Sequence, residues 1–302
     1  VYSRLARLEE DNIVAGYTVR LGQAFAAGRV RAHMMIKTLP RYHREVEAAL
    51  AGFTQVQAIH AISGEYDIIA MLEAEDSALL NELIDQLPRL AAFQQDFNYT
   101  AADWLPFYWR GFRQTTRYSY VLPLAKMEKL RENLSPDYRN NKLPKAAAQV
   151  KVHTGNDLNL FFRVHNSSFE RQGLEAPVAF DFLQRLDQAL ADHRAREIFW
   201  ATDLKSGAVH SVAYLVWDKQ SAYYLMAGDD PALRASGAGI LLAWEAIRYT
   251  KETLGLAAFD FAGSMIRPIE RVRRQFGAVQ KPYFRVQKEW SLAWKVGKAL
   301  LR

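Results

Sequence analysis

None of the 302 residues is cysteine, which excludes disulfide bonds, thiolate zinc sites and cysteine nucleophiles. No apolar run is long enough to span a bilayer, and no signal peptide opens the sequence. His33, His43 and His60 fall on different predicted elements without the spacing of metal ligands, so we expect no metal site. These absences favour a soluble, cytoplasmic protein.

The composition is that of a globular chain, with 50% hydrophobic and 12% aromatic residues. Its length allows two domains with cores of their own. Residues 1–100 carry 9 Lys and Arg against 13 Asp and Glu, whereas residues 101–302 carry 30 against 20. The basic second part suits an anionic partner such as coenzyme A, a nucleotide, tRNA or an anionic membrane surface. The asymmetry predicts two units of different origin, although no Pro-, Gly- or Ser-rich linker separates them.

A short amphipathic helix and a strand are predicted within residues 5–21. Beyond them, the first part alternates between period-2 and period-3.6 patterns. The predicted order is strand 30–38, helix 42–51, strand 56–62, strand 66–73, helix 77–87 and strand 93–99. A β-α-β-β-α-β order predicts a ferredoxin-like sandwich of four antiparallel strands backed by two helices.

Two segments of this part, VYSRLARLEEDNIVAGYTVRL and AISGEYDIIAMLEAED, resemble the Lrp/AsnC family of amino-acid-responsive regulators. The resemblance implies an Lrp/AsnC ligand-binding and dimerisation module over residues 1–98, a homo-oligomer formed through its sheet, and an effector site near Gly64, Tyr66 and Asp67. The alternative is that Gly64 is a turn glycine and Asp67 pairs locally. Only one helix of the family's helix-turn-helix is recognisable, so we expect no sequence-specific DNA binding.

The second part has a different order of elements. We predict strand 119–124, helix 126–133, strand 150–153, helices 157–170 and 178–194, strands 197–203, 208–218 and 221–227, helix 240–253, strand 257–262, helix 269–276 and strand 283–287. Between a strand and a helix stands Arg234-Ala-Ser-Gly-Ala-Gly239. A glycine loop that opens a helix presents backbone N–H groups to one point, which suits a pyrophosphate. A flexible helix start that binds nothing is the alternative.

The segments DWLPFYWRGFRQTTRYSYVL, LSPDYRNNKLPKA, GILLAWEAI, FDFAGSM and FGAVQKPYFRV resemble the FemAB/BioF2-like branch of the GNAT acyltransferase superfamily. The resemblance implies a domain over residues 99–302, and the whole chain then has an α+β fold whose second part contains a mixed, splayed sheet. It also implies transfer of an acyl group from acyl-CoA, or from aminoacyl-tRNA, to an amine acceptor, often in cell-envelope or peptidoglycan biosynthesis. In this branch a further N-terminal segment precedes the tryptophan-proline motif, and here the Lrp-like module takes its place.

The same resemblance assigns roles to residues around the loop. Backbone groups of Leu225–Ala227 hold the acyl arm between two splayed strands, and Arg234 adds a charge to the pyrophosphate. The amides that would bind the pyrophosphate are those of Gly237, Ala238, Gly239 and Ile240.

Acid–base chemistry has three candidates. Asp260 would position or deprotonate the amine, its alternative being a buried partner of an arginine such as Arg271. Tyr224 and Tyr283 are candidate proton donors to the leaving thiol, but the aromatic pattern favours a core aromatic stripe.

Basic residues outside the loop suggest further contacts with anions. A phosphorylated acceptor would meet Arg110, Arg113, Arg117 and Arg139, unless they form a solvated face. The C-terminal residues 290–302 form a basic amphipathic pattern, which predicts peripheral membrane contact or packing on the chain's own domain. The rival function is a non-catalytic, Lrp/AsnC-like amino-acid-responsive regulator with a degenerate transferase domain.

Overall fold

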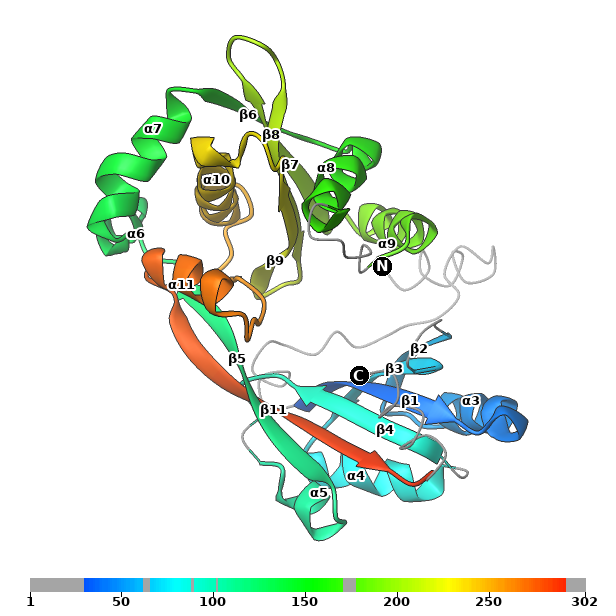
Figure 1. Cartoon of the computed structure of the whole chain (residues 1–302). Helices are drawn as coiled ribbons and strands as arrows, with labels where there is room; N and C mark the ends of the chain where they lie inside the picture. Colours follow the sequence, from blue (N-terminus) through cyan, green and yellow to red (C-terminus); the bar gives the residue numbers. More distant parts are fainter. Residues whose placement is uncertain (1–29, 62–65, 88–89, 102, 171–177, 292–302) are drawn as a thin grey trace, which may run out of the picture. The chain divides into compact units, whose positions relative to one another are not determined.

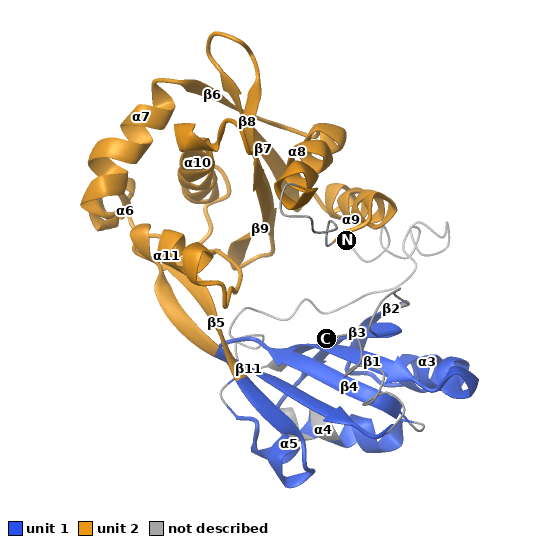
Figure 2. Ribbon diagram, viewed as in Figure 1, with its two compact units in different colours: residues 1–115, 283–302 blue, residues 116–282 orange. Residues whose placement is uncertain are grey.

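A computed structural model describes residues 30–61, 66–87, 90–101, 103–170 and 178–291. The chain forms two compact units, one of residues 1–115 with 283–302 and the other of residues 116–282 (Figure 2). The chain therefore leaves unit 1 and returns to it at the end. The domain boundary predicted at residue 98 stays a prediction, and so do the elements predicted before residue 30 and after residue 291, which lie outside the described residues.

Unit 1 contains a ferredoxin-like arrangement, as predicted. Its elements are β1 (Val30–Thr38), the 3-10 helix η1 (Pro40–Tyr42), α3 (His43–Ala51), β2 (Val56–Ala61), β3 (Ile68–Ala74), α4 (Ser77–Gln86), β4 (Leu90–Phe97) and α5 (Leu105–Trp109). The strands are antiparallel in the order β2-β3-β1-β4. A fifth strand, β11 (Val279–Glu289), pairs antiparallel with β4. The predicted four-stranded sheet thus gains a strand from the far end of the chain.

The pattern of β1 explains which face of this sheet is covered. Ala32, Met34 and Ile36 are buried at alternate positions, whereas His33 between them is exposed. The buried side chains pack with Val46 of α3 and with other apolar residues of unit 1. Each fully buried aliphatic side chain contributes about 1.5–3 kcal/mol through removal from water. The sheet therefore has one apolar face under α3 and α4, and one face that the helices of the described residues do not cover.

Unit 2 holds the larger set of elements, the first of which, β5, begins in unit 1 at Arg113. They are β5 (Arg113–Pro123), α6 (Met127–Asn133), the π-helix η2 (Tyr138–Lys142), α7 (Leu143–Ala147), β6 (Val150–Gly155), α8 (Leu158–Glu170), α9 (Phe180–Asp192), β7 (Arg196–Asp203), β8 (Val209–Trp217), β9 (Ser221–Asp229), the 3-10 helix η3 (Arg234–Ser236), α10 (Ala238–Glu252), β10 (Ala258–Asp260) and α11 (Arg267–Gln275). The strand order is β5-β10-β9-β8-β7-β6. Only the β9–β10 pair is parallel among the pairings of these strands that the structure records. The sheet is mixed, which confirms the predicted α+β class.

Helices lie on both faces of this sheet. Figure 1 shows α10 on one side of β7, β8 and β9, and α8 and α9 on the other. Neighbouring residues of a strand point to opposite faces of the sheet, so each strand contributes to a hydrophobic core on either side. Ala213 packs in the cluster with α10, and Tyr214 packs in the cluster with α8. The long apolar stretch of α10 is therefore a buried helix against the sheet.

Strands β9 and β10 separate after the first three residues of β9. The parallel pairing ends at Asp260 opposite Tyr223, whereas β9 continues to Asp229. The register between β8 and β9 also shifts, from Tyr214 opposite Met226 to Leu215 opposite Tyr224, so Leu225 is an extra residue in β9. A bulge of this kind bends a strand and re-aims its backbone. The splayed sheet expected from the sequence is present at this point.

Candidate active site

A cavity of about 570 Å³ lies in unit 2 where β9 separates from β10. Its walls come from β9, the segment before α10, the first turns of α10, and α11. Among its lining residues are these predicted site residues: Tyr224, Leu225, Ala227, Arg234, Gly237, Gly239 and Ile240. The structure therefore brings the predicted acyl-arm strand and the predicted phosphate loop to one space.

The loop is a tight helix start. Gly237 has φ 78° and ψ 17°, the left-handed conformation that favours glycine, and directly precedes α10. The Gly237 N–H donates to Arg234 O at 3.2 Å, and the Ile240 N–H donates to Gly237 O at 3.0 Å. The Ala238 N–H donates to Ser236 Oγ at 3.2 Å. Three of the four amides predicted to bind phosphate thus have acceptors within the loop, and an anion would have to replace those bonds.

The two glycines of the loop do different things. A Cβ at Gly237 would lie 3.9 Å from Ala146 Cβ and from Lys142 O, in ordinary contact with the side of α7 and η2. A Cβ at Gly239 would lie 2.6 Å from Asp229 Oδ1, closer than real Cβ atoms approach. Gly237 is therefore required for its backbone conformation, and Gly239 for the close packing of Asp229 against the first turn of α10.

Asp229 is the acidic residue of this cavity, and the sequence reasoning did not single it out. Its carboxylate accepts a hydrogen bond from Ser211 Oγ at 2.8 Å. Its backbone N–H and C=O bond to Ser168 Oγ at 3.2 and 2.9 Å. Burial raises the pKa of Asp229 above its usual value, although the Ser211 bond and the positive charge of Arg234 oppose the shift. The signal that would have found it is its place at the end of the strand that leads into the glycine loop.

Asp260 lies at the end of β10 with only 4% of its surface exposed. It accepts hydrogen bonds from Ser119 Oγ at 2.6 Å and from the Ala262 N–H at 2.8 Å. Burial raises its pKa, which those bonds and the charge of Arg273 partly offset. Arg273, rather than Arg271, is the arginine beside it. Asp260 is absent from the cavity's lining residues, and its role as a base stays a prediction.

The two predicted tyrosines have separate places. Tyr224 lines the cavity, and its ring centroid lies 6.0 Å from that of Phe259 and 6.3 Å from that of Phe261. Burial and the charge of Asp229 both raise the pKa of Tyr224, which keeps its hydroxyl protonated as a donor. Tyr283 belongs to unit 1.

The four predicted acceptor-binding arginines do not all fall in one unit. Arg110 and Arg113 belong to unit 1, whereas Arg117 and Arg139 belong to unit 2. The Arg139 guanidinium donates to Glu132 O at 3.1 Å and to Asn140 Oδ1 at 3.4 Å. Arg117 Nε is buried and has no hydrogen-bond partner among the residues that the structure describes.

The predicted effector residues of unit 1 have local partners. Tyr66 Oη donates to Gln94 Oε1 at 3.4 Å. The Asp67 carboxylate accepts from Lys37 Nζ at 2.6 Å and from Thr38, by its N–H and its Oγ1, at 2.9 Å each. Burial opposes ionisation of Asp67, but these bonds outweigh it and lower its pKa. Asp67 pairs locally, while Gly64 lies outside the described residues.

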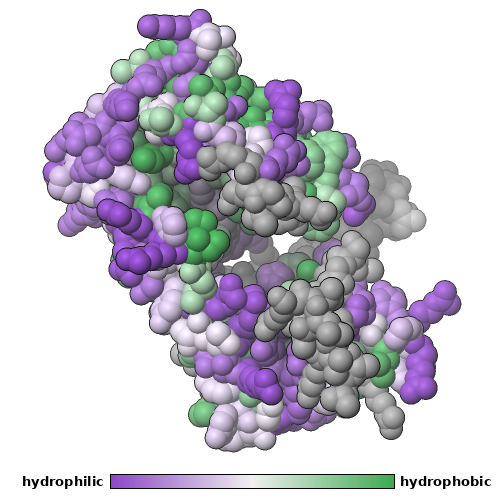
Figure 3. All heavy atoms as spheres, in the orientation of Figure 1, coloured by the Kyte–Doolittle hydropathy of each residue, from purple (hydrophilic) through white to green (hydrophobic). Residues whose placement is uncertain are grey.

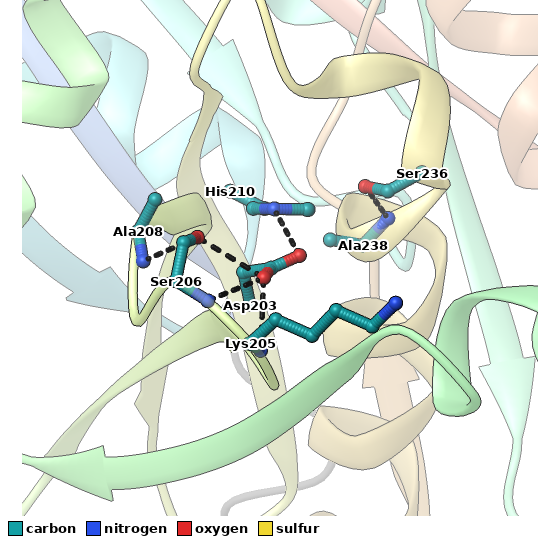
Figure 4. Close-up of polar contacts among 7 residues, drawn as sticks. All are labelled: Asp203, Lys205, Ser206, Ala208, His210, Ser236 and Ala238. Atoms are coloured by element: carbon teal, nitrogen blue, oxygen red, sulfur yellow. Dashed lines mark hydrogen bonds and ion pairs between the residues drawn. The ribbon is translucent and has the colours of Figure 1, made fainter.

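A polar cluster is close to the start of α10. Figure 4 shows Asp203 and His210 turned toward one another, with Ser236 and Ala238 drawn beside them. The contact joins His210 Nε2 and Asp203 Oδ2 at 3.4 Å, and His210 is only 4% exposed. Asp203 also accepts from the N–H groups of Lys205 and Ser206 at 3.0 and 2.8 Å. These bonds fix the β7–β8 turn.

One wall of the cavity is apolar. Ile269 and Val272 of α11 line it and are 41% and 40% exposed, and Met265 and Ile266 just before α11 are 55% and 58% exposed. Figure 3 shows hydrophobic atoms on the surface of unit 2 around the segment that leads into α11. An apolar wall of this size suits a hydrocarbon portion of a substrate.

Within the described ranges, no group of three or more His, Asp or Glu side chains is arranged to hold a metal ion. Among the helices of that same part of the chain, none combines the length and the apolar character that crossing a membrane requires.

The family comparison agrees with this geometry. Residues 130–268 match the family model of the acetyltransferase (GNAT) domain, which covers β6–β10 and the cavity's glycine loop. Unit 2 is GNAT-like. Residues 31–95 match the Lrp/AsnC ligand binding domain. Both resemblances predicted from the sequence are confirmed.

Relatives and solved structures add the following. A crystal structure of FemX is similar to the chain with a TM-score of 0.58 and 12% identity, over 83% of this chain and 96% of that one. An uncharacterised HTH-type transcriptional regulator of Pyrococcus abyssi is 29% identical over 84 residues, and one of Pyrococcus furiosus is 27% identical over 84 residues. Each match covers 28% of this chain and 57% of the relative. The likeness to FemX shows that the two chains share a fold.

Proposed function

We propose that unit 2 transfers an acyl group from a thioester such as acyl-CoA to an amine within the cavity beside β9. The observation that carries the proposal is the convergence of three features on that space. They are the end of the β9–β10 pairing at Tyr223, the bulge at Leu225 and the helix start at Gly237. An extended acyl arm can lie along β9 where β10 has left it, with its polar end at the helix start.

Asp229 is the group that this proposal assigns to the amine. Its carboxylate lies in the cavity, is held by Ser211, and has a pKa raised by burial. A base whose pKa moves toward neutrality accepts a proton more effectively at working pH. The amine nitrogen bonds to the thioester carbon as its proton passes to Asp229, and the carbon–sulfur bond breaks. Tyr224, kept protonated by burial, supplies a proton to the leaving sulfur. As the products leave, solvent returns a proton to Tyr224 and takes one from Asp229, so the net reaction converts thioester and amine into amide and thiol.

The donor's charged end is assigned to Arg234 and to the amides of residues 237–240. Arg234 lines the cavity and is exposed, so its guanidinium is available to a phosphate. The Ala227 carbonyl bonds to His165 Nδ1 at 3.1 Å, so Leu225 and Met226 are the residues assigned to the arm's backbone contacts. An aminoacyl-tRNA donor is the alternative that the basic second part favours, and an envelope precursor is the acceptor implied by the family resemblance.

The test is release of free thiol from acyl-CoA in the presence of a panel of amines. We expect turnover by the wild-type chain and a loss of about 10²-fold or more in Asp229→Asn, the usual contribution of a positioned base. Asp181→Asn is the matched control, because that carboxylate is 70% exposed on α9. Equal rates in Asp229→Asn and Asp181→Asn would show that Asp229 is not the base. If the wild-type chain releases no thiol from any donor, the proposed acyl transfer is wrong.

Two observations favour the second candidate, a regulator that binds ligand without turnover. Three of the four loop amides already have partners within the loop, and residues 31–95 match a ligand-binding domain. Binding of an amino acid measured by calorimetry, with no thiol release from acyl-CoA, would support this candidate. Under either candidate we propose that unit 1 associates with a second copy and that the chain lies in the cytoplasm without sequence-specific DNA binding.

A further inference from the structure

Unit 1 contains a cavity of its own, of about 660 Å³. Most of its wall is apolar and comes from Leu39, Ile84, Leu87, Leu90, Phe112 and Trp290. Asp85, Arg110 and Lys288 also line it. A volume of this order, apolar with a few convergent polar groups, is typical of a small-molecule site. Arg110, Phe112, Lys288 and Trp290 lie outside both family matches, and the proposed acyl transfer takes place in unit 2, so neither accounts for this cavity.

Arg110 lines this cavity and carries an unsatisfied donor. One guanidinium nitrogen, Nη2, contacts Asp85 Oδ2 at 2.7 Å. The other, Nη1, is shielded from solvent and has no hydrogen-bond partner among the described residues. A buried charged N–H without an acceptor costs more than a neutral one, and such groups normally bond to protein, water or a ligand. Arg110 therefore has one N–H group that an incoming acceptor would satisfy.

Lys288 places a second cation beside it. Its Nζ donates to the Arg110 carbonyl oxygen at 2.5 Å and lies 5.3 Å from the ring centroids of both Phe112 and Trp290. Those two rings meet edge to face with centroids 6.0 Å apart. The ammonium group is thus fixed between two aromatic walls, a position that stabilises a cation. Lys288 keeps further N–H donors, because an ammonium carries three.

The charges and the walls together specify the ligand. Arg110 and Lys288 bring two positive charges, and Asp85, 60% exposed, brings one negative charge. We propose that this cavity binds an apolar monocarboxylate, with its carboxylate on Arg110 Nη1 and Lys288 Nζ and its hydrocarbon part against Phe112 and Trp290. A single carboxylate satisfies the buried donor and neutralises the excess charge, and the apolar wall supplies the burial of the hydrocarbon.

The binding test uses the full chain and calorimetry with octanoate and with phenylacetate. We expect both to bind, and octanol and octylamine, which have a similar hydrocarbon but no carboxylate, to bind at least about 10-fold more weakly. Arg110→Gln and Lys288→Gln should each weaken octanoate binding about 10-fold or more for the same reason. Arg185→Gln is the matched control, since that guanidinium is 70% exposed on α9 of unit 2; its affinity should equal that of the wild-type chain.

A variant that strengthens binding separates recognition from folding. Asp85→Asn removes the carboxylate that competes for Arg110 and should tighten octanoate binding several-fold, which a loss of structure would not do. No octanoate binding by the wild-type chain, equal affinity for octanol, or weaker binding in Asp85→Asn would overturn the site. None of these readouts depends on acyl transfer, so failure of the proposed function leaves the test intact.

Discussion

Arg285 donates two hydrogen bonds of 2.6 Å to the two carboxylate oxygens of Asp96, although 189 residues separate them in sequence. Asp96 lies on β4, the last strand of the ferredoxin-like order, and Arg285 lies directly opposite it on β11. The fork of the guanidinium matches the carboxylate, which makes this pair specific in direction as well as favourable. The pair fixes the register of the strand that returns to unit 1.

Breaking that pair should destabilise unit 1. The two side chains are 25% and 29% exposed, so Arg285→Met should lower the free energy of unfolding by about 1.5–3 kcal/mol, the range for hydrogen bonds to charged groups. Arg285→Lys should retain only part of that free energy, because an ammonium group cannot donate two parallel hydrogen bonds to one carboxylate as a guanidinium does. Urea unfolding followed by circular dichroism measures both. An equal loss of unfolding free energy in the exposed control Arg185→Met would show that the Arg285–Asp96 pair makes no specific contribution to stability.

Asp229→Asn should stabilise the chain while it removes activity. Because the folded-state pKa of Asp229 is raised, ionisation at pH 7 costs stability, and that cost disappears as pH falls through the raised pKa. The neutral variant avoids the cost and keeps an acceptor for Ser211. Its thermal midpoint should exceed that of the wild-type chain at pH 7, with the difference shrinking toward pH 4. A lower midpoint at pH 7 would contradict the assignment.

The pH profile of thiol release tests the same carboxylate kinetically. With Asp229 as base, kcat/KM of the wild-type chain should fall on the acid side of a pKa above the usual value of 3.8. The residual kcat/KM of Asp229→Asn should lack that fall at acid pH. If the fall in kcat/KM at acid pH persists unchanged in the variant, another group is responsible for it.

The two loop glycines should respond differently to alanine. Gly239→Ala puts a Cβ 2.6 Å from Asp229 Oδ1, so the carboxylate must move, and turnover should be lost with a stability cost of about 1–3 kcal/mol. Gly237→Ala meets nothing closer than 3.9 Å. Its left-handed backbone costs about 1–2 kcal/mol, and turnover should survive. Thermal unfolding and thiol release should be measured on both variants. Higher turnover in Gly239→Ala than in Gly237→Ala would contradict the prediction.

Asp67 should contribute to acid stability. Its folded-state pKa is lowered, so its pairing with Lys37 and Thr38 stabilises the chain fully above pH 4 and is lost as pH falls through the folded pKa. Asp67→Asn should therefore be less stable than wild type at pH 7, and the two curves should converge toward pH 3. Unfolding midpoints across that range give the comparison; parallel curves would show that Asp67 makes no ionic contribution.

Association of the chain is expected through the face of the unit 1 sheet that its helices leave uncovered. Met71 on β3, 39% exposed, lies opposite His33 on β1. An apolar side chain on an uncovered sheet face gains from burial by a second copy. Light scattering should give a mass above 34.5 kDa, and Met71→Lys should lower it, whereas Leu204→Lys, 57% exposed in unit 2, should not. A monomer at all concentrations would exclude this interface.

Local pattern was sufficient for most elements because alternation and helical periodicity are properties of short windows. The strand at Val30–Thr38 has the predicted bounds, and α10 begins two residues before its predicted start. The segment 135–145 was predicted without a regular element because its polar, Asn- and Pro-containing sequence lacks periodicity, yet it forms η2 and α7. There Tyr138, Leu143 and Ala146 are buried in the core that packs α10.

By itself, the sequence determined the two family resemblances, the ferredoxin-like order and the glycine loop, since each depends on residues close together in the chain. Tertiary structure decided which residues share a site. Asp229 is the carboxylate in the cavity because β9 continues beyond the end of β10 and meets the first turn of α10. Asp260, the last residue of β10, bonds instead to Ser119. Lys288 reaches Arg110 because β11 returns to the sheet of unit 1, and pairing between strands so distant in the chain leaves no local pattern to read.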